Sequence, residues 1–153
     1  MGKTLNSYYG MAENDYLYAK AGLTVCEKLG NYNAVASGCA QAAEKYLKAL
    51  AERCLIEDSQ AVAILRTHNL RTLVAAIKKE LTYIDLNSKD CKWLGDYYYE
   101  ARYPGDNFVL VSKEDAEECI RITEKICEIV TEELTKIAES KRSVGLFEDM
   151  KRL

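Results

Sequence analysis

The stretch from Asn33 to Cys54 reads NAVASGCAQAAEKYLKALAERC, and it decides the fold of this chain. Its apolar residues recur at alternating intervals of four and three, which is the period of one face of an α-helix. The residues on this face are Ala36, Ala40, Ala43, Leu47, Leu50 and Cys54. Because much of the face is alanine, a neighbouring helix can approach closely. The stretch therefore predicts a long helix with a continuous apolar seam.

The flanking sequence predicts further helices of the same kind. Residues 8–29 form one, and Gly30 and Asn31 provide the C-terminal stop that helices prefer. Ser112 is an N-cap candidate for a long last helix that runs to about Glu139, with acidic residues in its first turn. Two shorter helices are expected at residues 67–81, with Thr67 as the N-cap, and at residues 89–101.

The remaining segments connect these helices. Glu57 to Ser59 form a polar break, and residues 60–65 are expected to make a short helical turn. Residues 102–111 form a loop that contains the turn signal Pro104-Gly105. Phe108 to Val111 is the only β-like run and has no partner strand. We therefore predict an all-α fold, an up-and-down bundle of about five helices.

The domain organisation follows from this pattern. The bundle is expected to span residues 1–140, and residues 141–153 form a C-terminal tail or short docking helix. Four apolar residues of this tail could form one stripe: Leu146, Phe147, Met150 and Leu153. The tail is then a frayed end, a strap across its own bundle, or a docking helix for a partner.

Composition limits the class of protein. The net charge of −3 and the pI of about 5.3 argue against a general nucleic-acid binder, although a local basic site remains compatible with them. No apolar run approaches the ~18 residues that a bilayer span needs. The first six residues lack the apolar core of a signal peptide. We expect a soluble, cytoplasmic protein without a membrane partner.

The cysteines and the single histidine make a metal site unexpected. None of the six cysteines forms a Cys-x-x-Cys pair, and each lies in an apolar helical pattern, so buried free thiols are favoured over disulfides. One histidine without paired cysteines cannot build a zinc site. No glycine-rich phosphate loop is present either. We therefore expect neither a metal nor a cofactor.

Three polar segments are candidates for function. The first lies on the central helix, where four polar residues three or four positions apart share a face: Gln41, Glu44, Lys45 and Lys48. This face is either simply solvated or part of a site. The second is Thr67 to Leu70 with His68, which has either a structural or a catalytic role. The third is Arg102, which could bind phosphate or carboxylate, cap helix carbonyls or pair with an internal acid.

These segments occur in one order, and together they resemble the HEPN domain family (higher eukaryotes and prokaryotes nucleotide-binding). The family pattern is Gln-x-Ala-x-Glu-Lys-x-Leu-Lys, then Thr-His-x-Leu, then Arg-Tyr-Pro before a long last helix. The resemblance covers about residues 10 to 135. It implies a helical bundle that forms a homodimer and stands beside a minimal nucleotidyltransferase, often as a toxin–antitoxin pair. The ligand-binding residues that it implies are Gln41, Glu44, Lys45, Lys48, His68, Arg102 and Tyr103.

Catalytic members of this family are metal-independent ribonucleases, whose motif is an arginine followed, after four to six residues, by a histidine. Here those positions after Arg102 hold Asn107, Phe108 and Val109, none of which transfers a proton near neutral pH. The leading hypothesis is therefore a protein without catalytic residues that binds a nucleotide, an RNA or a partner nucleotidyltransferase. One alternative is a divergent ribonuclease that uses Arg102 and His68. The other is a structural homodimeric scaffold module.

Overall fold

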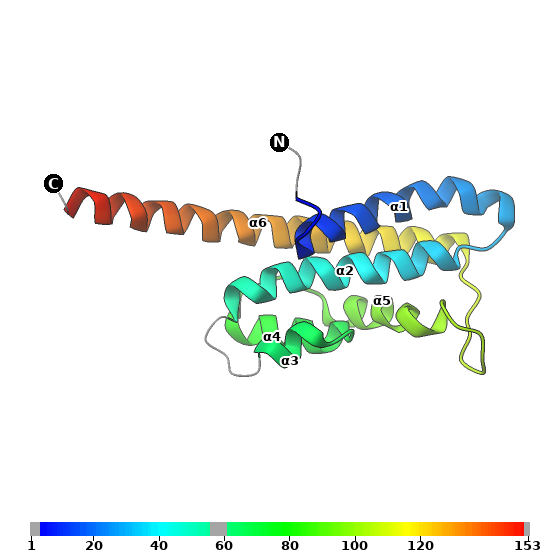
Figure 1. Cartoon of the computed structure of the whole chain (residues 1–153). Helices are drawn as coiled ribbons and strands as arrows, with labels where there is room; N and C mark the ends of the chain where they lie inside the picture. The colour runs from blue at the N-terminus through cyan, green and yellow to red at the C-terminus, as the bar shows by residue number, and fades with distance from the viewer. Residues whose placement is uncertain (1–3, 56–60, 152–153) are drawn as a thin grey trace.

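The computed structural model describes residues 4–55 and 61–151 and is a bundle of helices (Figure 1). The helices are α1 (Tyr8–Leu29), α2 (Asn33–Cys54), α3 (Ala61–Arg66), α4 (Leu70–Glu80), α5 (Ser88–Glu100) and α6 (Lys113–Lys151). The described residues contain no strand. The predicted all-α bundle is confirmed. The described residues form six helices in place of about five, because the expected turn at residues 60–65 corresponds to the short helix α3.

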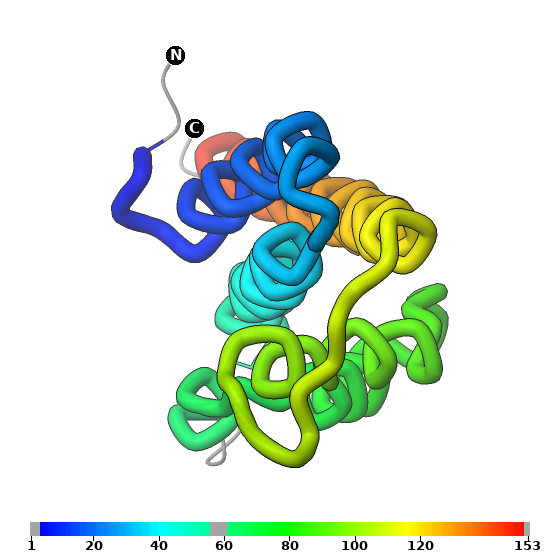
Figure 2. Tube along the Cα trace, turned by 90° about the vertical axis from the view of Figure 1, so that its right-hand side faces the viewer, coloured from blue at the N-terminus to red at the C-terminus, as the bar shows by residue number. Residues whose placement is uncertain are grey.

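Helix α2 is the centre of the bundle. It contacts α1 and α6 on one side and α3, α4 and α5 on the other, and Figure 2 shows it between these two groups. The alanine-rich seam of α2 accounts for this position. Its residues Ala36, Ala40, Ala43, Leu47 and Leu50 are all at most 2% exposed. The small side chains let neighbouring helices approach from both sides.

The ends of α1 and α2 agree with the sequence pattern. Helix α1 begins after Ser7, whose hydroxyl accepts a hydrogen bond from the amide of Gly10 at 2.9 Å. It ends at Gly30, where φ is +72°, a left-handed conformation that glycine adopts without steric cost. The predicted stop at Gly30-Asn31 and the bounds of both helices are confirmed.

Two predicted helix ends are wrong. Asn69, and not Thr67, caps α4: its Oδ1 accepts a hydrogen bond from the amide of Thr72 at 3.3 Å. Thr67 instead accepts from the amide of Asn69, because it stands two residues before the position that caps the helix. Helix α6 does not end near Glu139 but runs to Lys151, because a single glycine such as Gly145 costs only about 1 kcal/mol in a helix.

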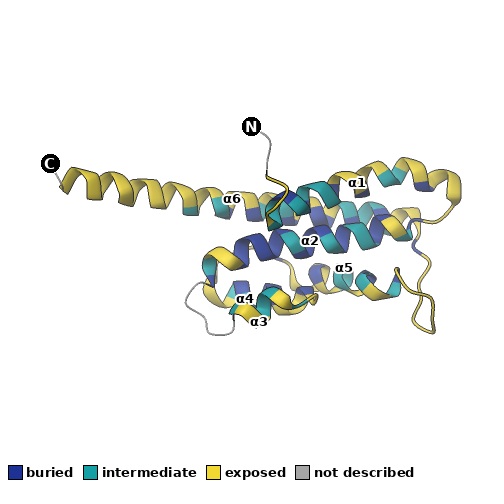
Figure 3. Cartoon of the chain, viewed as in Figure 1, coloured by how far each residue is buried: buried dark blue, intermediate teal, exposed yellow. Residues whose placement is uncertain are grey.

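The C-terminal part of α6 extends away from the bundle. Every residue from Ala138 to Lys151 is exposed, so this part makes no strap across its own chain (Figure 3). Leu153 of the predicted stripe and the predicted break at Glu57–Ser59 lie outside the described residues. The division of the chain at residue 140 stays a prediction.

All six cysteines are free thiols, as predicted. Four of them are buried, namely Cys26, Cys39, Cys91 and Cys119, and the other two are half-buried. Burial raises the pKa of the Cys39 thiol to about 12 and that of Cys91 to about 11. These thiols are therefore protonated, unreactive parts of the core at neutral pH.

Candidate functional site

A buried carboxylate of α2 holds the only histidine of the chain. Oε1 of Glu44 lies 2.9 Å from Nδ1 of His68, which belongs to the connection between α3 and α4. Glu44 is 6% exposed, whereas the side chain of His68 is 51% exposed. Because an ionised carboxylate only accepts hydrogen bonds, Nδ1 of the neutral imidazole carries the hydrogen and Nε2 keeps a free lone pair.

The second oxygen of Glu44 binds Lys48 one helical turn later. Nζ of Lys48 donates to Oε2 of Glu44 at 3.2 Å, and Lys48 is only 5% exposed. The ammonium also lies 5.9 Å from the ring centre of Tyr8 at the start of α1. The alternative that this face of α2 is merely solvated is therefore wrong for Glu44 and Lys48, which form a buried ion pair.

Tyr98 of α5 joins the histidine to the arginine. The imidazole of His68 stacks on the ring of Tyr98, with 5.1 Å between centroids and 12° between planes. Cζ of Arg102 lies 4.6 Å from the centroid of the same ring and 5.4 Å from that of Tyr103. Within residues 4–55 and 61–151 the guanidinium of Arg102 forms no ion pair. Its donors thus remain available to an anion.

The loop that follows Arg102 is fixed by the first residue of α2. The side-chain amide of Asn33 donates to the carbonyl oxygens of Ala101 at 3.2 Å and Val109 at 2.8 Å. Its Oδ1 accepts from the amide of Val111 at 2.9 Å. Asn33 thereby holds both ends of the 102–110 segment and positions Arg102 at the end of α5.

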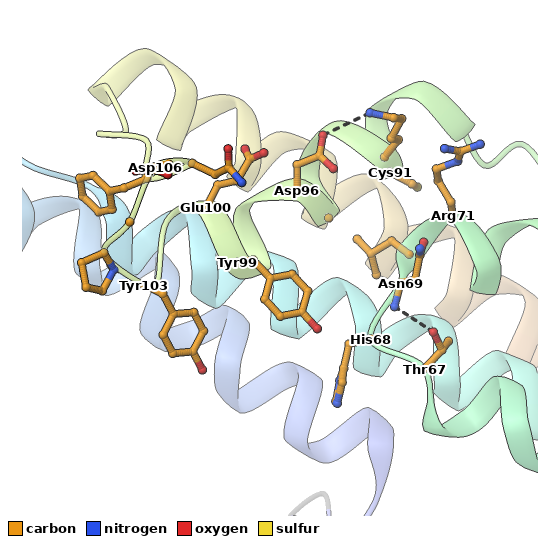
Figure 4. Close-up of a pocket in the computed structure, with 17 residues that line it drawn as sticks. Thr67, His68, Asn69, Arg71, Cys91, Asp96, Tyr99, Glu100, Tyr103 and Asp106 are labelled. Atoms are coloured by element: carbon orange, nitrogen blue, oxygen red, sulfur yellow. Dashed lines mark hydrogen bonds and ion pairs between the residues drawn. The ribbon is translucent and has the colours of Figure 1, made fainter.

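A cavity of about 650 Å³ opens beside this cluster, between the start of α4, one face of α5 and residues 103–108. In Figure 4 the rings of His68, Tyr99 and Tyr103 lie on one side of it. The carboxylates of Asp96, Glu100 and Asp106 lie on the other. Arg102 is outside the lining, but its guanidinium contacts the ring of Tyr103, which is part of it.

The charges of the cavity are only partly paired. Asp96 forms an ion pair with Lys92 at 3.3 Å, and Arg71 adds a second cation to the lining. No hydrogen bond or ion pair joins the carboxylate of Glu100 to another described side chain, and Glu100 is half-buried. The cavity therefore presents a free acceptor inside and, at Arg102, a free cation beside it.

The predicted site residues separate into two groups. Glu44, Lys48, His68, Arg102 and Tyr103 lie in one connected cluster. Gln41 and Lys45 lie against α1 instead: Lys45 pairs with Asp15 of α1, and Gln41 lines a small surface hollow together with Asp15. The side chain of Gln41 also donates to the carbonyl oxygen of Ser37, one turn earlier in α2, at 3.5 Å. Whether any of these residues binds a ligand stays a prediction.

Sequence reasoning missed three residues of this region. Tyr98 stands four positions before Arg102 and so shares a helix face with it, a signal that the run of three tyrosines concealed. Glu100 had no distinguishing signal beyond its place beside that run. Asn33 had none at all, because its three hydrogen bonds go to residues 68 to 78 positions away.

Two features of the described residues limit what this site can be. No group of three or more His, Cys, Asp or Glu residues is arranged to hold a metal ion. None of the helices in the described part of the chain is both long and apolar enough to cross a membrane.

The sequence was compared with known families, curated proteins and solved structures. Residues 7–134, most of the chain, match the HEPN domain. Neither the curated proteins nor the solved structures give a match. The matched range contains α1 to α5 and the buried part of α6, and with them the whole Glu44–His68–Tyr98–Arg102 cluster. This chain belongs to the HEPN domain family.

Proposed function

We propose that this protein binds an RNA or a nucleotide, with a phosphate at Arg102 and a base in the cavity beside it. The observation that carries the proposal is the guanidinium of Arg102, which has no carboxylate partner among the described residues and lies over the rings of Tyr98 and Tyr103. A guanidinium suits phosphate because it offers several donors in a fixed plane. Exposed rings such as Tyr99 and Tyr103 suit bases because every base has a face that can stack.

The partner in this proposal is a minimal nucleotidyltransferase, in a pair of the toxin–antitoxin kind, and the protein itself is a homodimer. HEPN domains typically pair with nucleotidyltransferases. Exposed apolar residues on the outer face of α1, Leu17, Tyr18, Val25 and Leu29, supply a surface that supports such contacts. Co-purification with the neighbouring gene product and sedimentation at micromolar concentration test these two statements. A monomer that captures no nucleotidyltransferase contradicts them.

Binding can be measured directly with a fluorescent short RNA. We expect Arg102→Ala to weaken binding about tenfold or more and to reduce its dependence on salt, because one phosphate contact is lost. Arg121→Ala is the matched control, since Arg121 is an exposed arginine of α6 that pairs with Glu118 away from this cluster. If both variants bind like the parent chain, or if the parent chain binds no RNA or nucleotide, the proposed function is wrong.

A second candidate function is RNA cleavage, and the Glu44–His68 pair favours it. The positions where the ribonuclease motif of the family has its histidine hold Asn107, Phe108 and Val109 here. His68 is nevertheless oriented by a buried carboxylate and shares the Tyr98 ring with Arg102. An imidazole held in this way by a carboxylate acts as a general base at its other nitrogen.

The corresponding reaction needs no metal. Nε2 of His68 takes the proton of an RNA 2′-hydroxyl, and the 2′ oxygen forms a bond to the adjacent phosphorus while Arg102 stabilises the charge on the phosphoryl oxygens. The bond from phosphorus to the 5′ oxygen breaks, and this oxygen takes a proton from water. The hydroxide that remains takes the proton of the His68 imidazolium, which restores the neutral base. The products are a 2′,3′-cyclic phosphate and a 5′-hydroxyl.

Cleavage is tested with end-labelled RNA in the presence of EDTA. Activity that is lost in His68→Ala and in Arg102→Ala separately, but kept in Arg121→Ala, supports this second candidate. RNA that stays intact at high protein concentration leaves binding as the function. If the chain neither cleaves nor binds, the homodimeric scaffold hypothesis takes the place of both.

A further inference from the structure

The cavity beside Arg102 has a composition that selects among bases. Its described rings are exposed enough to stack on a ligand: Tyr99 is 61%, Tyr103 is 54% and Phe108 is 48% exposed. Opposite the tyrosines lie the carboxylates of Asp96, Glu100 and Asp106 (Figure 4). The lining has these three carboxylates but only two cationic side chains, those of Arg71 and Lys92, so its net charge is negative. A phosphate therefore fits at Arg102 outside the cavity, and the uncharged part of a nucleotide fits inside.

Among the three carboxylates, Glu100 is the best placed to accept hydrogen bonds from the uncharged part of a nucleotide inside the cavity. Lys92 already pairs with Asp96, and Asp106 is an exposed residue of the loop. Glu100 is half-buried at the end of α5, two residues before Arg102, and its carboxylate has no hydrogen-bond partner among the described side chains. The backbone around it is fixed, because its carbonyl oxygen accepts from the amide of Val109 at 2.9 Å.

A carboxylate that only accepts hydrogen bonds discriminates between the bases. The Watson–Crick edge of guanine carries two neighbouring donors, N1–H and N2–H, which match the two oxygens of one carboxylate. Adenine and cytosine each place a ring-nitrogen acceptor next to their amino group, and uracil places its N3–H between two carbonyl oxygens. Each of these edges turns at least one lone pair toward the carboxylate.

We infer that the cavity is a guanine-selective site, in which Glu100 accepts from N1–H and N2–H while Tyr99 or Tyr103 stacks on the base. This inference rests on the proposed function and adds the identity of the base. A quaternary ammonium group, which aromatic rings with nearby acids also attract, fits less well. The guanidinium of Arg102 already lies at the Tyr103 ring, and its charge disfavours a second cation there.

The experiment measures the binding of 5′-mononucleotides to the full chain by calorimetry. We expect GMP to bind about tenfold more tightly than AMP, CMP or UMP. IMP, which lacks the N2 amino group, should fall in between. Glu100→Gln should abolish the preference, because its amide keeps only one acceptor for guanine and turns a donor toward the ring-nitrogen acceptor of adenine. The matched control is Glu114→Gln, an exposed acid in the first turn of α6 that is not part of the cavity, and it should keep the preference.

The other outcomes separate the two proposals. Equal binding of all four mononucleotides overturns guanine selection and keeps the proposed function, whereas no binding of any nucleotide or RNA removes both. If GMP binds much more tightly than dGMP and AMP more tightly than dAMP, the carboxylate reads the ribose, and the inference is wrong. Choline that displaces bound GMP assigns the cavity to an ammonium ligand and also overturns it.

Discussion

One carboxylate, that of Glu44, holds two basic side chains from different parts of the chain. Its Oε1 lies 2.9 Å from Nδ1 of His68, and its Oε2 lies 3.2 Å from Nζ of Lys48. Glu44 and Lys48 are both nearly fully buried, whereas His68 reaches the surface. The carboxylate thus links the core of α2 to the histidine beside the cavity, and removing it should affect both stability and binding.

Glu44→Ala should destabilise the fold by about 3–5 kcal/mol, because it leaves the ammonium of Lys48 buried without its partner. The double variant Glu44→Leu, Lys48→Met should lose much less, since no buried charge remains. Urea unfolding of each variant measures this difference. The exposed pair Lys92–Asp96 is the control, and its removal should change the free energy of unfolding by less than about 1 kcal/mol. A Glu44→Ala variant as stable as that control would contradict the buried pair.

Tyr98 should matter through its ring and not through its hydroxyl. The ring contacts both the His68 imidazole and the Arg102 guanidinium. We therefore expect Tyr98→Phe to bind RNA like the parent chain and Tyr98→Leu to bind about three- to tenfold more weakly. Fluorescence anisotropy with the same labelled RNA measures both. Phe147→Leu, which changes an exposed aromatic residue in the C-terminal part of α6, is the control and should have no effect on RNA binding. If Tyr98→Phe loses RNA binding, the hydroxyl of Tyr98 is required and the prediction is wrong.

The central helices could be predicted to the residue because their signals are local. The seam of α2 repeats over its whole length, and Gly30 at +72° is the stop that the sequence indicates for α1. The end of α6 could not be predicted, because residues 140–151 contain no proline and no helix cap stronger than Gly145. The polar sequence of residues 140–151 resembles the end of a helix, although in the structure α6 continues through it.

The sequence predicted several residues of the candidate site, but it did not predict how they are arranged in space. The residues Glu44, His68 and Arg102 carry recognisable chemistry in the sequence, yet only packing brings α5 and the 67–69 connection onto α2. Helical spacing placed Lys45 and Glu44 together, while in the fold Lys45 pairs with Asp15 of α1 and takes no part in the Glu44–His68 cluster. Contacts of this kind are long-range, and no local pattern encodes them.

Asn33→Ala should loosen the loop that follows Arg102. The variant loses three hydrogen bonds, to the carbonyl oxygens of Ala101 and Val109 and from the amide of Val111. We expect a loss of about 1–3 kcal/mol in unfolding free energy, because the amide of the buried Val111 is left without an acceptor. Hydrogen exchange should show faster exchange at Val111 and unchanged exchange in the middle of α2. Unchanged exchange at Val111 would contradict this role for Asn33.

The buried thiols predict a loss of stability in alkaline solution. The pKa of Cys39 is raised by burial from 9.0 to about 12, so the folded state keeps a proton that the unfolded state releases. Stability is unaffected below pH 9 and falls as the pH rises from 9 toward 12. At pH 10 Cys39 alone should cost about 1.4 kcal/mol. Urea unfolding at pH 7.5 and 10 in reducing buffer measures this, and Cys39→Ala should show a smaller difference between the two values. If Cys39→Ala and the parent chain lose the same stability between pH 7.5 and pH 10, groups other than Cys39 cause the loss.

A chain that ends at Ser140 should fold with the stability of the full chain. The residues removed from α6 include the apolar Val144, Leu146 and Phe147, which are 59%, 67% and 58% exposed and so contribute little to the core. We expect the free energy of unfolding to change by less than about 0.5 kcal/mol and RNA binding to be kept. A chain that ends at Val130 is the contrasting control. It lacks the buried Glu133, which accepts a hydrogen bond from the Tyr83 hydroxyl at 2.8 Å, and should be clearly less stable. If the chain ending at Ser140 unfolds as easily as this control, the bundle extends beyond residue 140 and the division of the chain there is wrong.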